Sequence, residues 1–434
     1  MDSNIVKFIY SHILMPIAYF IFGIYSKFID KAKVREDIWY DLIINIPKKK
    51  SNTLRILIHA SSMGEFEQVK PVIKEIRNII PECEIIASFF SPSGYINLKN
   101  SDDIDFAVYM PVDTITNAKL FTDAIKPDIS IFVRYDLWFN HLNELHKSGS
   151  KNYLICATMP SDSFVLKFSP VRTYFRMCYD KFNRIFTAGQ SHTDLIKSFG
   201  TITNIITSSD TRADRIISSV SYSQNHKILP DDILHDCFTL VAGSTWQKDE
   251  EIIAEAVNEI NKDKFRIRVI YTPHEPTVVN INRIKALHSN VISLSTLLNE
   301  VSSLNNNVII SELVNSHIVT DSIGKLLQLY ANADIAFVGC GFGDGVHSVS
   351  EPAGYGIPIA CGPNINKMPD AVHLNNAGSL KIINNSSELK EWLLKMINDN
   401  DSRNYTGRIA KEYIISTAGS SKIIAEMILN SDTN

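Results

Sequence analysis

The chain has 434 residues, of which 45% are hydrophobic and 21% are charged, and its formal net charge is −4. This length predicts two or three domains, and the apolar fraction excludes a disordered chain. The lack of a basic excess argues against binding to nucleic acid. The six cysteines show no CxxC spacing, so we expect reduced thiols rather than disulfides or a zinc site.

The N-terminus carries an uncharged stretch of nineteen residues between Lys7 and Lys27. A membrane-spanning helix needs about 20 apolar residues, and the tyrosines of this stretch suit a membrane interface. The basic residues that follow would hold the next domain on the cytoplasmic side. We therefore expect residues 1–40 to attach the protein to a membrane, either spanning it or lying in its interface. The alternative is a hydrophobic helix that is buried against the globular domain.

Strand and helix patterns then alternate in two sets. The first set, residues 41–216, has apolar runs at 54–60, 85–90, 129–133, 153–157 and 185–188. A polar linker is expected at 217–234, and the second set, residues 235–434, has runs at 238–242, 267–271, 308–310, 335–338 and 358–360. Strands separated by helices form parallel sheets with crossover helices. The fold class is therefore α/β, with two Rossmann-like, doubly wound domains facing a central cleft, and ligands bind in the loops after such strands.

The first such loop contains Ser62-x-x-Glu65. This spacing is a capping box, in which Glu65 accepts a hydrogen bond from the first amide of the helix. A carboxylate in this position can also act as a general base towards an acceptor hydroxyl.

Two loops of the second domain suit a phosphate or a nucleoside. Gly243, Ser244 and Thr245 offer amides and hydroxyls at a helix start, although Ser244 could simply cap that helix together with Gln247. His274 lies in a turn bounded by prolines, where it could contact a phosphate or a ribose, or only form a surface turn.

The most specific loop is the stretch VGCGFGDGVHSVSEPA at 338–353. Alternate glycines after a strand allow close approach of a ligand to the backbone. The pattern is neither the dinucleotide fingerprint nor a Walker loop, and Ser348-x-x-Glu351 is again a possible capping box. This arrangement fits the nucleotide-sugar site of a two-domain glycosyltransferase.

Taken in order, these fragments resemble the 3-deoxy-D-manno-octulosonic acid (Kdo) transferases of lipid A biosynthesis, in a divergent branch, which have the GT-B fold. The resemblance covers nearly the whole chain and rests on IHASSMGEF (58–66), PSG (92–94), YMPVD (109–113), RYDLWFN (134–140), DTRADR (210–215), AGST (242–245), PHE (273–275), DSIGKLLQLYANADIAFVG (321–339), GVHSVSEPA (345–353) and GPN (362–364).

The resemblance implies an inverting glycosyltransferase that moves Kdo from CMP-Kdo to a lipid A precursor. It implies no metal and no cofactor, and a location at the cytoplasmic face of the cell inner membrane. Glu65 matches the family's general base, and Asp136 matches an acidic position of the acceptor lobe. The positions implied for the nucleotide-sugar side are Arg212, Gly243, Ser244, Thr245, His274, Gly345, His347, Ser348 and Glu351.

The sequence departs from the common pattern of the family at several positions. Asp136 stands where glutamate is usual, Pro273 where a phosphate-binding arginine is usual, and Ser348 where asparagine is typical. These changes concern contacts with CMP more than the class of reaction.

Two other interpretations are open. Another GT-B glycosyltransferase could use a UDP-sugar for a glycolipid or cell-wall precursor, and would bind UDP rather than CMP. A non-enzymatic two-lobed binding protein would keep its ligand affinity after replacement of Glu65.

Overall fold

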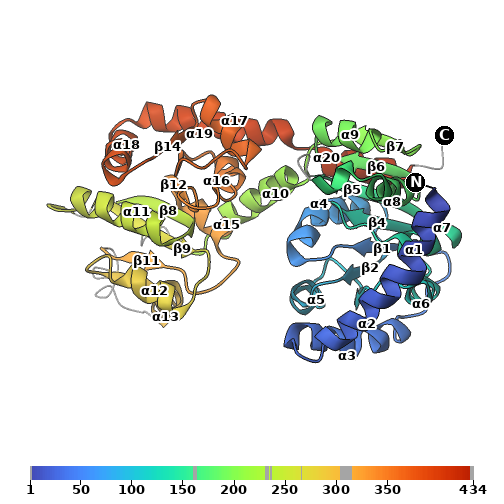
Figure 1. Cartoon of the computed structure of the whole chain (residues 1–434). Coiled ribbons are helices and arrows are strands. Elements are labelled where there is room, and N and C mark those ends of the chain that lie inside the picture. Colours follow the sequence, from blue (N-terminus) through green and yellow to red (C-terminus); the bar gives the residue numbers. More distant parts are fainter. Residues whose placement is uncertain are drawn as a thin grey trace. The chain divides into compact units, whose positions relative to one another are not determined.

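The computed structural model describes residues 2–159, 164–229, 234, 237–264, 266–303 and 315–430. The chain forms two compact units (Figure 1). Unit 1 consists of Met1–Arg215 and Ala418–Asn434, and unit 2 consists of Ile216–Thr417. Within the described part of the chain, each unit contains one parallel sheet of seven strands.

The strands of unit 1 are β1 (Arg55–His59), β2 (Glu84–Phe89), β3 (Phe106–Tyr109), β4 (Ile129–Val133), β5 (Lys151–Ala157), β6 (Arg184–Thr187) and β7 (Asn204–Thr207). Their spatial order is β3-β2-β1-β4-β5-β6-β7. Every residue of β1 and β4 is buried, as expected for the central strands of a parallel sheet with both faces covered. The strand order reverses between β1 and β4, and ligands of such sheets bind at this switch point.

The helices of unit 1 are α1 (Ser3–Ile9), η1 (Tyr10–Leu14), α2 (Met15–Tyr25), α3 (Asp30–Ile44), α4 (Met63–Ile79), α5 (Pro92–Leu98), α6 (Ile115–Ile125), α7 (Phe139–Lys147), η2 (Phe164–Lys167), α8 (Ser169–Tyr179), α9 (Gln190–Lys197) and α20 (Ser420–Leu429). Helix α10 (Arg212–Asn225) begins in unit 1 and ends in unit 2. The buried face of α4 carries Phe66, Val69, Val72, Ile73 and Ile76, the spacing of an amphipathic helix.

The strands of unit 2 are β8 (Phe238–Thr245), β9 (Ile267–Pro273), β10 (Val291–Ser293), β11 (His317–Val319), β12 (Ile335–Val338), β13 (Ile359–Cys361) and β14 (Leu380–Ile382). Their order is β10-β11-β9-β8-β12-β13-β14, so the switch point lies between β8 and β12. The helices are α11 (Gln247–Ile260), α12 (Val278–Lys285), α13 (Leu294–Ser303), α15 (Leu326–Leu329), η4 (Tyr330–Asn332), α16 (Ser350–Tyr355), α17 (Pro369–Asn376), α18 (Ser386–Asn398) and α19 (Asn400–Thr417).

The strands predicted from long apolar runs are confirmed, apart from that at 308–310, which lies outside the described residues. Sequence analysis missed β3, β7, β10, β11 and β14. These strands have three or four residues, and β7, at the sheet edge, contains no buried residue. Such strands lack the long apolar run that marks a central strand.

The expected linker at 217–234 is wrong in its first half, because α10 continues as a helix to Asn225. Ile216 and Val220, four residues apart, are both buried, and the side chain of Ile216 packs closely against Gly354. The polar composition that suggested a linker belongs to the outer face of this helix.

The end of the chain also departs from the expected domain 235–434, because residues from Ala418 onward belong to unit 1. Ile424, Ala425 and Ile428 of α20 lie in the core of unit 1. The Asp214 carboxylate accepts hydrogen bonds from the amides of Gly419 and Ser421. Sequence order alone cannot reveal that a terminal helix returns to the first domain.

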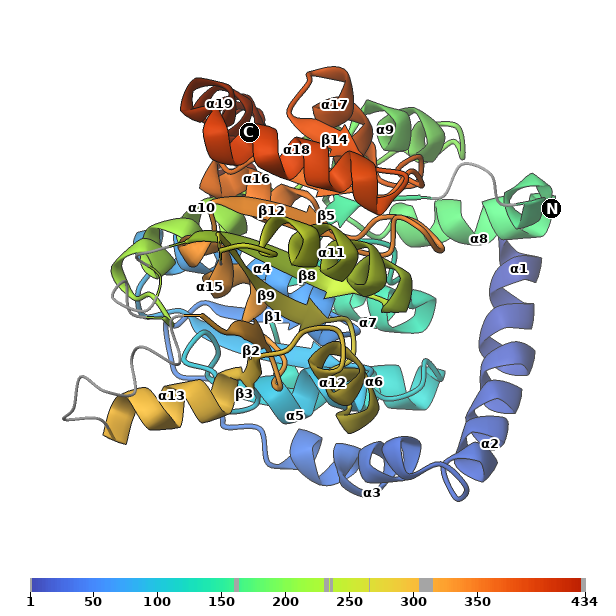
Figure 2. The same cartoon turned by 90° about the vertical axis from the view of Figure 1, so that its left-hand side faces the viewer.

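The N-terminal helix, formed by α1, η1 and α2, crosses one side of unit 1 from α8 to α3 (Figures 1 and 2). Ser3–Tyr25 is long and apolar enough to cross a membrane by length and composition. One face of it is tied to unit 1 by polar contacts. Tyr10 donates a hydrogen bond to Asp113, Ser11 donates one to Asn140, and the guanidinium of Arg35 lies 4.8 Å from the Phe22 ring.

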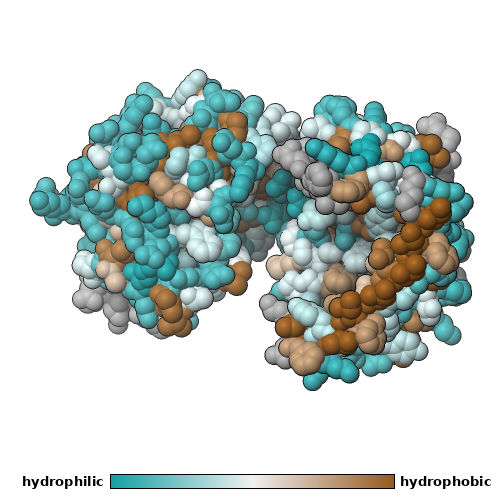
Figure 3. All heavy atoms as spheres, viewed as in Figure 1, coloured by the Kyte–Doolittle hydropathy of each residue, from teal (hydrophilic) through white to brown (hydrophobic). Residues whose placement is uncertain are grey.

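The other face of this helix is exposed and apolar. It forms a continuous band of hydrophobic side chains across unit 1 (Figure 3). The exposed residues are Ile5, Phe8, Ile13, Leu14, Ile17, Phe20, Ile21 and Ile24. A contiguous apolar patch of this kind marks a surface for binding a membrane or another protein.

Candidate functional site

Glu65 lies in the first turn of α4, directly after β1, and Asp136 lies in the loop that follows the adjacent strand β4. Because both strands run in the same direction, their carboxyl ends meet at one edge of the sheet, at the switch point. Sequence analysis predicted both residues, and the fold brings them close enough to interact electrostatically.

Glu65 forms the predicted capping box. The Ser62 amide donates to Glu65 Oε2 at 3.2 Å, and the Glu65 amide donates to Ser62 Oγ at 3.4 Å. Glu65 is only 7% exposed. The capping role is thus confirmed, and it also holds the carboxylate in place at the carboxyl end of β1.

Asp136 is held by a chain of polar groups. His59 Nε2 lies 2.8 Å from Asp136 Oδ2, and His59 Nδ1 lies 2.9 Å from Ser88 Oγ. Ser61 also donates a short hydrogen bond to Asp136. His59 is fully buried at the end of β1. Its imidazole therefore holds the Asp136 carboxylate in a fixed position.

The two carboxylates are driven to different proton affinities. Burial raises the pKa of Glu65, and the charge of Asp136 raises it further. Burial alone would raise the pKa of Asp136 as well, but the neighbouring His59 and the hydrogen bond from Ser61 bring it below its ordinary value. Two neighbouring carboxylic acids whose pKa values shift in opposite directions are typical of an acid–base site. In such a site, the acid with the raised pKa accepts or donates the proton.

Arg212 starts α10 in unit 1, and its Nε lies 2.8 Å from Asp210 Oδ2. The preceding residue, Thr211, donates to the carbonyl oxygen of Gln68 on α4. The 210–215 segment therefore packs on α4, the helix that carries Glu65. The Arg212 side chain is partly exposed.

In unit 2, the loop after β12 packs directly on the end of β8. The Gly339 amide donates to the Gly243 carbonyl at 2.9 Å. A Cβ at Gly339 would lie 2.4 Å from the Ser244 oxygen, and a Cβ at Gly243 would lie 2.3 Å from the Tyr330 hydroxyl. These glycines are required by close packing within the protein, so they form the base of the predicted nucleotide loop.

Ser244 has a left-handed backbone, with φ of 53°, and does not cap a helix. Helix α11 instead begins after Trp246, whose amide donates to Asp249 Oδ2 at 2.9 Å. Thr245 is buried and donates to Glu250 at 3.1 Å. The possible cap by Ser244 and Gln247 is therefore wrong, because the strand continues three residues further than the apolar run indicated.

Three aromatic rings stack where β8, β9 and β12 end. His274 stacks on both Trp246 and His347, with ring centroids 5.2 Å and 4.6 Å away, and Trp246 Nε1 donates a 3.5 Å hydrogen bond to His347 Nε2. The Trp246 ring is about half exposed. Burial and the neighbouring His274 lower the pKa of His347. The predicted residues His274 and His347 thus form one stacked aromatic cluster with Trp246.

Of the remaining predicted residues, Gly345 and Ser348 lie on the loop between β12 and α16, and Glu351 lies in α16. Gly345 has φ of 134°, which favours glycine, and the Val346 amide that follows it donates to the Asn364 carbonyl at 2.9 Å. Helix α16 begins at Ser350, so the predicted capping box of Ser348 and Glu351 is wrong. Glu351 lies in the first turn of α16, near the buried Tyr330.

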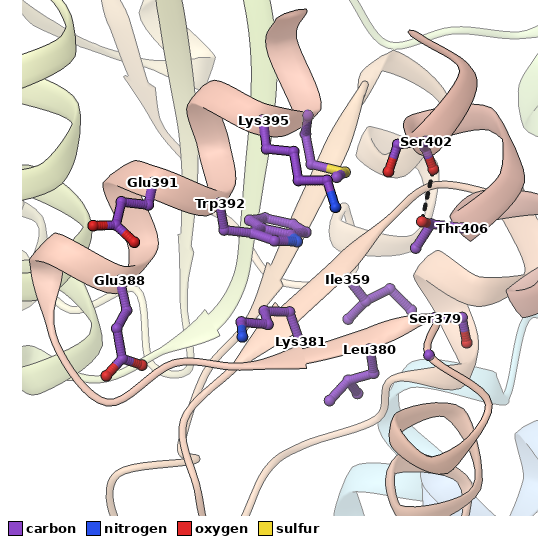
Figure 4. A pocket seen from close by; sticks show the side chains of 12 residues that line it. Ile359, Ser379, Leu380, Lys381, Glu388, Glu391, Trp392, Lys395, Ser402 and Thr406 are labelled. Atoms are coloured by element: carbon purple, nitrogen blue, oxygen red, sulfur yellow. Dashed lines mark hydrogen bonds between the residues drawn. The ribbon is translucent and has the colours of Figure 1, made fainter. Parts of the chain in front are cut away.

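Within the residues that the structure describes, no three His, Cys, Asp or Glu side chains are placed to hold a metal ion. A cavity of about 410 Å³ lies near β14 and α18, lined among others by Lys381, Trp392 and Lys395 (Figure 4). None of the predicted site residues lines it.

Sequence analysis missed three residues of these sites. His59 lies in the quoted IHA fragment but was read only as part of a strand. Trp246 follows the AGST fragment directly. Asp249 accepts from the Trp246 and Cys340 amides, and burial raises its pKa to about 6. Of these three residues, only Trp246 carried a sequence signal of a binding role, because it is an aromatic residue next to a predicted ligand loop.

The chain is similar in sequence to known transferases. Residues 34–215 match the sequence model described as 3-Deoxy-D-manno-octulosonic-acid transferase (kdotransferase). The chain is 25% identical over 365 residues to the 3-deoxy-D-manno-octulosonic acid transferase of Rickettsia bellii, which covers 82% of this chain and 83% of that protein. It is 22% identical to the protein of the same name from Haemophilus influenzae, over 86% of each chain.

Solved structures support the fold. A UDP-GlcNAc 2-epimerase from Neisseria meningitidis matches with a TM-score of 0.60 and 14% identity, over 87% of this chain and all of that one. A glycosyltransferase from Rickettsia africae matches with a TM-score of 0.56 and 13% identity, over 87% and 99%. These two-domain matches identify the GT-B type of fold. By its sequence match over residues 34–215 and by its relatives, the chain is similar to the Kdo transferases, a family of glycosyltransferases.

Proposed function

We propose that the protein transfers Kdo from CMP-Kdo to a lipid A precursor. The observation that carries the proposal is the pair Glu65 and Asp136, which interact at the switch point of unit 1 and have opposite pKa shifts. This pair lies within the segment that matches the family.

In the proposed reaction, Glu65 accepts the proton of the acceptor hydroxyl. The hydroxyl oxygen forms a bond to the anomeric carbon of Kdo while the bond from that carbon to the CMP phosphate breaks, with inversion. A raised pKa makes Glu65 a stronger base at neutral pH than an ordinary glutamate. Asp136, fixed by His59, would orient the acceptor.

Unit 2 would bind CMP. The amides of the 243–245 and 339–345 loops suit phosphate oxygens, and the exposed Trp246 ring offers a face for a nucleobase. Glu351 would hold ribose hydroxyls, and Arg212 would meet the Kdo carboxylate or a phosphate. Gly345, His347 and Ser348 belong to the same proposed surface.

The proposed location is the cytoplasmic face of the inner membrane. Support comes from the N-terminal helix, which lies along unit 1 with polar contacts on one face and an apolar band on the other. Because this helix packs along the side of unit 1, we expect it to lie in the membrane interface rather than to span the bilayer.

The test is Kdo transfer to a tetraacylated lipid A precursor, followed by mass spectrometry, with CMP-Kdo generated in the reaction. A mass increase of one or more Kdo units is expected. Titration calorimetry with CMP and UDP runs alongside. Binding of UDP but not CMP, together with no Kdo transfer, would instead favour a UDP-sugar transferase.

A further inference from the structure

A cavity of about 350 Å³ lies in unit 1 between the N-terminal helix and α8, a size within the range of ligand pockets. Its aliphatic lining consists of Val6, Ile9, Leu14, Pro170 and Val171, and two tyrosine rings complete the wall. The cavity therefore lies within one unit, between two helices that are far apart in the sequence.

The two tyrosines contribute rings rather than free hydroxyls. Tyr10 donates to Asp113 at 2.7 Å, and Tyr174 donates to the Leu137 carbonyl at 2.8 Å. With both hydroxyls engaged, the lining is apolar. An open pocket with an apolar lining of this kind suits an apolar ligand.

The cavity is continuous with the apolar band of the N-terminal helix. Leu14 lines the cavity and is also half exposed, and its neighbours Ile13 and Ile17 are exposed as well. A hydrocarbon chain lying on the band (Figure 3) would enter the cavity without crossing a polar surface.

The cavity is also connected to the acidic site. Tyr174, in its wall, is hydrogen-bonded to Leu137, which directly follows Asp136 in the chain, and adjacent Cα atoms are about 3.8 Å apart. A lipid whose tail occupies the cavity would therefore hold its headgroup near Asp136. Lys181 interacts electrostatically with Lys7 of the N-terminal helix and with Lys147, and such a group of basic side chains suits an anionic headgroup.

We infer that this cavity binds one acyl chain of the lipid acceptor and thereby positions its headgroup at the acidic site. This inference rests on the proposed function, since it names a subsite for that acceptor.

The test compares wild type with V171W, which fills the cavity, and with I17W, a matched control on the exposed band. Each protein is irradiated with palmitate carrying a terminal diazirine, and labelled peptides are identified by mass spectrometry. We expect labelling of residues 6–14 or 170–174 in wild type and I17W, and its loss in V171W. The KM of V171W for the acylated acceptor should rise roughly tenfold, equivalent to about two methylenes displaced from burial. Its KM for a deacylated acceptor should be unchanged.

Undiminished labelling of the same peptides in V171W, labelling confined to other peptides, or equal loss of activity on both acceptors would overturn the inference. If V171W does not fold, V171S places a hydroxyl in the same wall, and the same losses are expected of it. If the wild type transfers no Kdo but labelling still depends on Val171, the proposed function is contradicted. The assignment of the cavity as an acyl-binding site would still hold. Normal transfer without labelling of the cavity would refute the cavity alone.

Discussion

Tyr10 of the N-terminal helix donates a 2.7 Å hydrogen bond to Asp113, a carboxylate that is completely buried. The same carboxylate accepts the amides of Asn140 and His141 at 3.0 and 2.8 Å. A single acidic side chain thus joins the N-terminal helix to the start of α7, three residues beyond Asp136.

Tyr10→Phe is expected to loosen the N-terminal helix. The change leaves one lone pair of a buried carboxylate without a donor, which costs about 1–3 kcal/mol. Hydrogen exchange of the amides in Ser3–Tyr25 should become faster, and denaturant unfolding should begin earlier. Tyr19→Phe, at an exposed position, is the control and should leave both unchanged. Equal exchange in the two variants would contradict the anchoring role.

Stability is expected to depend on the protonation of Asp113. Burial raises the pKa of Asp113 from 3.8 to about 7, against the effect of its hydrogen-bond donors. The folded protein therefore binds more protons than the unfolded chain between these values. The contribution of Asp113 to the free energy of unfolding should be full at about pH 4 and lost as the pH rises to about 7.

This dependence can be measured by urea unfolding at a series of pH values. His141 lies 3.8 Å from Asp113, but burial lowers the pKa of His141 to about 3, so it is neutral across this range. Asp113→Asn should flatten the dependence on pH. An unchanged slope in that variant would assign the effect to another group.

Glu65→Gln separates the two roles of this residue. Glutamine can still cap α4, but it cannot accept a proton. We expect kcat to fall by about 10²–10⁴-fold, with CMP affinity and melting temperature close to those of wild type. Glu65→Ala removes the cap as well and should also lower stability by about 0.5–2 kcal/mol. Full activity in Glu65→Gln would reduce Glu65 to a structural cap.

Gly339→Ala tests the packing of the nucleotide loop. The added Cβ would lie 2.4 Å from the Ser244 carbonyl oxygen, a backbone atom that cannot move away easily. We expect a loss of about 1–3 kcal/mol of stability and weaker CMP binding by calorimetry. Gly343→Ala is the matched control, since its Cβ would meet no atom closer than 3.7 Å. Similar behaviour of the two variants would show that the close approach is unimportant.

The sequence by itself determined the class of fold and the resemblance to the Kdo transferases. Central strands such as β4 and β12 are apolar runs because both of their faces are buried, and this pattern is visible without a structure. Ser62-x-x-Glu65 predicted its own capping box, because capping depends on residues three apart in the chain.

Only the tertiary structure decided which distant residues meet. The hydrogen bonds from His59 to Asp136 and from Tyr10 to Asp113 join residues at least 70 positions apart. Helix α20 likewise packs in the core of unit 1 against residues far from it in the sequence. Side-chain contacts of this kind depend on the order of strands in the sheet and on helix packing, and local periodicity carries no information about either. The supporting histidine and the acyl-sized cavity could therefore be recognised only in the folded protein.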